Sequence, residues 1–212
     1  MTIHVPALAC SFLVILTTLL TACGGSESED TSDAATRQAL HNTNVNWPPR
    51  AADPAAPIDP LHGVLKRWSL PIPVKTNNEP RAAQAMDAIE SRLGATIFDR
   101  TSIAGLPDDA ALNTRGIFIS VGTASGAACG TTVSQLQGAN AELMESRISL
   151  DGAACTANVD VTIHEFGHAL GMFEHFQNFG EGGPIGELFW RVLRTIYRNG
   201  IGTPAADIVL AP

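Results

Sequence analysis

The 212-residue chain has few charged residues and few aromatic ones. Charged side chains make up 16% of the chain and aromatic ones 6%, whereas apolar residues make up 45%. Basic residues are scarce: there are 13 against 21 acidic residues, and lysine occurs only at positions 66 and 75. Because nucleic-acid-binding proteins carry a clustered basic surface, we expect no nucleic-acid partner. The apolar content excludes a disordered chain, and the length favours one domain or at most two.

The stretch from Thr2 to Ala22 lacks lysine and arginine and is mostly apolar. Its apolar core has the length of a signal peptide and is shorter than a membrane-spanning helix. The stretch ends in LTAC, which resembles the lipobox of bacterial lipoproteins, where the cysteine is lipidated after cleavage. This resemblance implies a signal peptide over 1–22, a lipid on Cys23 and a place in the cell envelope, at the outer membrane or the periplasmic face. A plain signal peptide or an uncleaved anchor is the alternative.

Residues 23–60 are polar and acidic at first and then rich in proline, with five prolines between positions 48 and 60. Such a stretch has little apolar surface to offset the entropy cost of ordering the chain. We therefore predict a flexible tether over 23–60 and a single folded domain over 61–212.

Two of the four cysteines remain once Cys10 is assigned to the signal peptide and Cys23 to the lipid. Cys129 and Cys155 would then lie in an exported protein, where thiols oxidise. We predict a disulfide bond between them, with two buried free thiols as the alternative. Neither has the CxxC neighbour that is typical of a zinc site.

The pattern along the domain predicts strands and helices in alternation. Period-two alternation of apolar residues predicts a strand over 66–75, and an apolar stripe predicts a helix from Glu79-Pro80 to Gly94. Four further strands are predicted over 95–100, 115–121, 129–135 and 146–150. A helix then runs to about Leu170 and ends at Gly171, and a last helix covers 185–199. This order predicts an α+β domain with one twisted, mixed five-stranded sheet backed by helices.

Residues 164–171, HEFGHALG, carry the strongest chemical signal. His164 and His168 are four residues apart, so on a helix they share a face and can direct two imidazole nitrogens at one Zn²⁺ ion. Glu165 lies beside the first ligand and can move a proton from water to the leaving amine. His175 is a candidate third ligand. The alternative, a polar helix face without a metal, is disfavoured because the other helix positions are apolar.

The third ligand requires a sharp turn after the helix. His175 follows His168 by seven residues, which is about 10.5 Å along an unbroken helix and too far for one metal. Gly171 can adopt the positive φ that such a turn needs. Glu174 and Glu187 are the alternative ligands. We predict His175, since a neutral imidazole keeps the charge of the site at +2.

The HEFGHALG motif followed by a histidine is similar to the metzincin zinc peptidases, most of all to their matrixin branch, whose pattern is HExxHxxGxxH. Two features differ: His175 comes one residue late, and no methionine follows Met172, so the family's methionine turn has no counterpart. The resemblance implies a five-stranded sheet, a backing helix, an active-site helix and a short C-terminal helical subdomain. It also implies that substrate adds to an antiparallel edge strand, here around 129–135.

These features together predict a lipid-anchored, zinc-dependent endopeptidase with one catalytic Zn²⁺ and Glu165 as general base and acid. We expect a monomer that binds a peptide or protein substrate and contacts the membrane only through its lipid. Two alternatives remain open: a non-catalytic, zinc-containing surface binding module, and a zinc hydrolase that acts on peptidoglycan amides. Tyr197, the only tyrosine, is expected to pack in a helix rather than to act in catalysis.

Overall fold

The structure is a computed structural model. It describes residues 29–48, 59–107, 114–122, 129–136, 140–151, 159–179 and 184–212. The predicted signal peptide, Cys23 and Cys155 lie outside these ranges. Within the described ranges, no helix combines the length and the apolar character that crossing a membrane requires.

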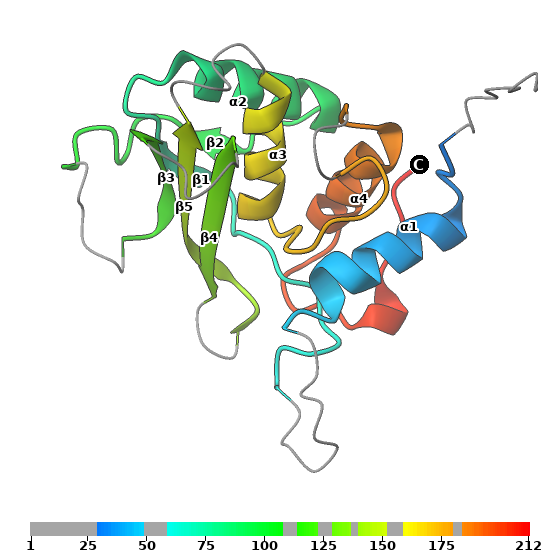
Figure 1. The fold of residues 1–212 in the computed structure, drawn as a ribbon. Helices are drawn as coiled ribbons and strands as arrows, with labels where there is room; N and C mark the ends of the chain where they lie inside the picture. Colours follow the sequence, from blue (N-terminus) through cyan, green and yellow to red (C-terminus); the bar gives the residue numbers. More distant parts are fainter. Residues whose placement is uncertain are drawn as a thin grey trace, which may run out of the picture.

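Five strands form one mixed sheet in the order β2-β1-β3-β5-β4 (Figure 1). They are β1 (Ile72–Lys75), β2 (Phe98–Asp99), β3 (Gly116–Gly122), β4 (Gly130–Leu136) and β5 (Leu143–Asp151). All neighbouring strands are parallel except β4, which pairs antiparallel with β5 at the edge. The predicted α+β class, the mixed sheet and the position of an antiparallel edge strand are confirmed.

The first strand is shorter than predicted, because it begins at Ile72 rather than at Lys66. Two side chains at the start of the predicted strand have partners elsewhere. The indole of Trp68 donates a hydrogen bond to the carbonyl oxygen of Ala169, at 2.7 Å, and Lys66 is fully buried against backbone carbonyls. Over 66–71 the backbone makes an isolated bridge, between Arg67 and Glu142 at the start of β5, rather than a continuous ladder.

Two helices pack on one face of the sheet, and a third lies beyond them (Figure 1). Helix α2 (Pro80–Leu93) begins after the Glu79 cap and ends at Gly94, whose φ is +66°. Helix α3 (Val159–Ala169) lies beside β4, between the sheet and α4 (Glu187–Arg198). All three helices were predicted within two to three residues of their bounds.

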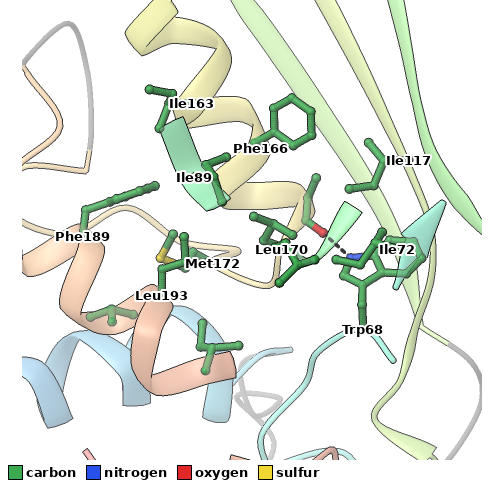
Figure 2. Packing of buried hydrophobic residues seen from close by; sticks show 14 of the residues in the cluster. Trp68, Ile72, Ile89, Ile117, Ile163, Phe166, Leu170, Met172, Phe189 and Leu193 are labelled. Carbon is green, nitrogen blue, oxygen red and sulfur yellow. Dashed lines mark hydrogen bonds between the residues drawn. The ribbon is translucent and has the colours of Figure 1, made fainter. Parts of the chain in front are cut away.

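Buried apolar side chains pack on two sides of α3, toward the sheet and toward α4 (Figure 2). On the side of the sheet, Phe166 is fully buried, as is Ile117 of β3. On the other side, Met172 and Phe189 are fully buried between α3 and α4. Helix α3 is therefore held by apolar contacts on two flanks, and its remaining face is the one that carries the histidines.

The predicted tether is wrong for residues 29–48, which fold onto the domain. Helix α1 (Asp33–Leu40) is capped by Ser32 and continues into a π-helical turn over His41–Val45. It lies along α4 (Figure 1). The carboxylate of Glu29 accepts hydrogen bonds from the first backbone amides of α4, at 2.7 and 2.8 Å. Such tertiary contacts stabilise a segment whose own apolar content is low.

Candidate metal centre

Helix α3 places the first two histidines and the glutamate of the motif as predicted. His164 and His168 lie one turn apart and are half-buried, whereas Glu165 is 5% exposed and turned toward β4. Gly167 sits on the opposite flank, where a Cβ would lie 2.7 Å from the Phe189 ring. A glycine is thus required here by the aromatic side chains of the core.

The chain turns sharply at the end of α3, as the sequence predicts. Gly171 has φ +109°, and a Cβ there would lie 3.0 Å from a backbone carbonyl oxygen. The carbonyls that the helix end leaves without helical partners accept hydrogen bonds from side chains. The donors are Trp68 to Ala169, Tyr197 to Leu170, Asn44 to Gly171 and His168 to Met172. The turn is therefore fixed from several directions.

Three imidazole nitrogens converge after this turn. The Nε2 atom of His168 lies 3.1 Å from that of His164 and 3.1 Å from that of His175, and the third pair is 3.2 Å apart. A tetrahedral zinc ion bonded at about 2.0–2.1 Å requires nitrogens about 3.3–3.4 Å apart. The three residues therefore fit a zinc ion, and they are the one potential metal-binding group among the described residues.

The protonation of the cluster also suits a cation. The Nδ1 atom of His168 lies 2.6 Å from the carbonyl oxygen of Met172, which can only accept, so Nδ1 carries the proton and Nε2 has a free lone pair. Burial is the main cause that lowers the pKa of His164 to about 3 and that of His168 to about 4, and the neighbouring histidines contribute to both shifts. Neutral imidazoles with converging lone pairs cannot satisfy one another, whereas a shared metal ion would accept all three.

Glu165 is held by the edge strand. The Thr132 hydroxyl lies 2.6 Å from Oε2 of Glu165, to which it donates. Burial raises the pKa of Glu165, and the Thr132 hydrogen bond opposes this rise. Gly130 leaves space beside the other oxygen, since a Cβ at Gly130 would lie 2.7 Å from Oε1. Oε2 thus accepts a hydrogen bond from Thr132, whereas Oε1 packs directly against Gly130.

Phe179 forms an apolar base for the three histidines. Its ring centroid lies 4.7 Å from that of His164, 4.8 Å from that of His168 and 5.6 Å from that of His175. The side chain is fully buried, and its ring also contacts the Phe189 ring at 5.0 Å. The sequence has no methionine after Met172, and the residue beneath the cluster is this phenylalanine from the loop that follows the third histidine.

The alternative ligands lie elsewhere. Glu174 is exposed and is not part of the group of converging atoms. The carboxylate of Glu187 is paired with Arg92 at 2.6 Å and with Arg194 at 2.7 Å, at the start of α4. The Tyr197 hydroxyl donates to the carbonyl oxygen of Leu170, and burial raises the pKa of this phenol. Its contacts are those of a packing residue.

Three residues of the site were missed by sequence reasoning: Thr132, Gly130 and Phe179. A glycine inside a predicted strand is a signal of close approach by another group, so Gly130 could have been found. Phe179 gave no signal, because a lone aromatic residue in a loop has no periodicity. Cys129 is disulfide-bonded. Its predicted partner, Cys155, lies outside the described residues, so the pairing stays a prediction.

No protein-family model, curated protein or solved structure matches the chain. The assignment of a function therefore depends on the residues and geometry described above.

Proposed function

We propose that the chain is a zinc-dependent endopeptidase of the metzincin type. The observation that carries the proposal is the convergence of three Nε2 atoms, 3.1–3.2 Å apart, next to a buried carboxylate on the same helix. His164, His168 and His175 would hold the ion. A zinc ion in this position supplies Lewis-acid chemistry, polarising the scissile carbonyl and making water a stronger acid.

The protein residues supply the proton transfer and its direction. Oε2 of Glu165 is occupied by the Thr132 hydroxyl, so Oε1 accepts the proton from the attacking water. The same oxygen then gives the proton to the amine nitrogen as the peptide bond breaks. The Nδ1 hydrogen bond of His168 to Met172 holds that ring in the orientation in which Nε2 faces the cluster.

Strand β4 is suited to align a peptide. It is the edge strand of the sheet, and its Thr132 contacts Glu165 while the neighbouring Val133 is 66% exposed on the opposite face. An extended peptide could add to the free edge through main-chain hydrogen bonds. A peptide bound in this way would pass beside the histidine cluster.

The decisive test compares Glu165→Gln with the matched control Glu174→Gln. Glu165→Gln should retain one zinc per chain but lose about 10²–10⁴-fold in kcat/KM, because a general base is removed and no ligand is. Glu174→Gln should retain both zinc and activity. The assay is cleavage of a peptide library by full-length protein, with metal content measured on the same samples. Full activity in Glu165→Gln would contradict the mechanism.

The same assay, run in parallel with peptidoglycan as substrate, separates the alternatives. A binding module would hold zinc yet cleave neither peptides nor peptidoglycan, and a peptidoglycan amidase would cleave only the latter. We also propose that the chain is exported and lipidated at Cys23. A palmitate analogue should label the wild type and not Cys23→Ser.

A further inference from the structure

A pair of aromatic rings stands beside the histidine cluster. Trp47 follows the π-helical turn of the N-terminal segment, and Phe173 lies in the turn after α3. Their ring centroids are 4.3 Å apart and the ring planes are inclined by 30°. Residues 126 positions apart in the sequence therefore form one apolar wall.

Hydrogen bonds fix the N-terminal segment to the turn that carries His175. The backbone amide of Phe173 donates to the carbonyl oxygen of Thr43, at 2.9 Å. The Thr43 hydroxyl donates to the carbonyl oxygen of Glu174, at 2.6 Å, and accepts from the Glu174 amide, at 3.0 Å. The Asn44 side chain donates to the carbonyl oxygen of Gly171, at 2.7 Å.

A buried lysine, Lys66, also binds the N-terminal segment. Lys66 is fully buried, and its Nζ donates to the carbonyl oxygens of Asn44, Val45 and Val64, each at 3.0 Å. Charge-assisted hydrogen bonds of this kind are stronger than neutral ones. Trp47 is therefore attached to a rigid part of the fold, which a tether could not provide.

The aromatic pair borders a cavity of about 310 Å³. The described residues that line it are Trp47, Phe173, Thr132, Ser134, His168 and His175. None of these is a carboxylate, a lysine or an arginine. A lysine or arginine side chain that entered would lose hydration without gaining a carboxylate partner, whereas an apolar side chain would gain contact with two rings.

We propose that Trp47 and Phe173 form a subsite that binds one large, apolar side chain of the peptide substrate. This inference rests on the proposed function. Thr132 and Ser134 are two residues apart on β4, so they present their side chains on the same face, toward α3. The cavity is thus continuous with both the edge strand and two of the histidines. A peptide lying along β4 places a side chain there within a few residues of the cleaved bond.

The test is a cleavage profile of a randomised peptide library with full-length wild type, Trp47→Ala and Trp47→Phe. The wild type should prefer Leu, Phe or Met over Lys and Arg at one position within three residues of the cleaved bond. Trp47→Ala should lower kcat/KM for these peptides 10- to 100-fold and change it less than threefold for peptides with Ala there. Trp47→Phe should retain most of the preference. Val133→Ala, on the opposite face of β4, is the matched control and should leave the profile unchanged.

A second readout does not need activity. The chain has three tryptophans, of which Trp68 is 0% and Trp190 6% exposed, so acrylamide quenching of fluorescence reports on Trp47. The tripeptide amide acetyl-Leu-Leu-Leu should protect Trp47 from quenching, and the tripeptide amide acetyl-Lys-Lys-Lys should not. If no peptide is cleaved but the leucine peptide protects Trp47, the endopeptidase proposal fails and the pocket stands. An unchanged profile in Trp47→Ala, or equal quenching with both peptides, would overturn the subsite.

Discussion

The apolar base beneath the histidines is open to a direct test through Phe179. The ring of Phe179 contacts all three imidazoles and is fully buried. If it only fills the core, its truncation lowers the stability of the metal-free and metal-loaded protein equally. If it also sets the orientation of the rings, truncation weakens metal binding as well. We predict the second outcome.

The magnitude follows from burial and from linkage. Truncating a buried phenylalanine to alanine typically costs about 3–5 kcal/mol of unfolding free energy. Loss of a partner that orients metal ligands typically weakens metal binding about 10- to 100-fold. In excess zinc this lowers the stabilisation that the metal provides by about 1.4–2.7 kcal/mol. Phe179→Ala should therefore be destabilised more in zinc than in chelator by that difference.

The assay measures the zinc dissociation constant by chelator competition and the free energy of unfolding in urea, with and without zinc. Phe179→Leu, which keeps more of the apolar volume, is a second variant in case Phe179→Ala does not fold. The matched control is Phe189→Leu. Its ring is also fully buried and contacts Phe179 rather than the histidines. It should lose stability with an unchanged dissociation constant.

The outcome that refutes the reasoning is specific. If the Phe179 variants lose stability but bind zinc as tightly as the wild type, the ring is an ordinary core residue. The same holds if the Phe189 variant loses zinc affinity to the same degree.

Three further predictions follow from single residues. Gly130→Ala should retain zinc but lose at least tenfold in kcat/KM, because its Cβ would lie 2.6–2.8 Å from three atoms of the Glu165 side chain and displace it. An unchanged kcat/KM would show that the position of the Glu165 carboxylate does not depend on a glycine at 130. Gly171→Ala should lose about 1–3 kcal/mol in urea unfolding, since φ is +109°, and unaltered stability would contradict the strained turn. The hydrogen bond from Arg81 lowers the pKa of Glu79 in the folded protein. The pair therefore stabilises the fold above about pH 4.3, the pKa of a free glutamate, and this stabilisation is lost as the pH falls. The free energy of unfolding of Glu79→Gln should thus change less between neutral and acid pH than that of the wild type.

The sequence predicted most of the elements that position the site. Period-two and helical patterns found the strands of the sheet and helices α2, α3 and α4, because each has one face in the core and so keeps a regular pattern. The glycine stop at Gly171 and the need for a turn toward His175 came from helix geometry alone. The structure brings the Nε2 atoms of the three histidines together as that geometry requires.

The parts that the sequence did not predict depend on contacts between distant segments. Helix α1 has little apolar surface, and only the positions of Thr36, Ala39 and Leu40 are buried. The contacts that join it to the domain include Glu29 at the start of α4, the Arg191–Asp33 ion pair at 2.5 Å, and the core packing of Ala39 and Leu40. Pairing across such separations leaves no local pattern, so a polar, proline-containing segment is indistinguishable from a tether in the sequence.

The order of this segment changes what a lipid on Cys23 would do. A tether over 23–60 would allow a reach of about 120–130 Å at full extension. Glu29, six residues after Cys23, already accepts hydrogen bonds from the first amides of α4. Six residues span at most about 20–22 Å. A lipid on Cys23, as proposed, would therefore hold the domain within about 20 Å of the membrane surface. Since Trp47 of this same segment borders the proposed subsite, the proposed anchor would place that subsite near the membrane, and the proposed substrates would be peptides near that surface.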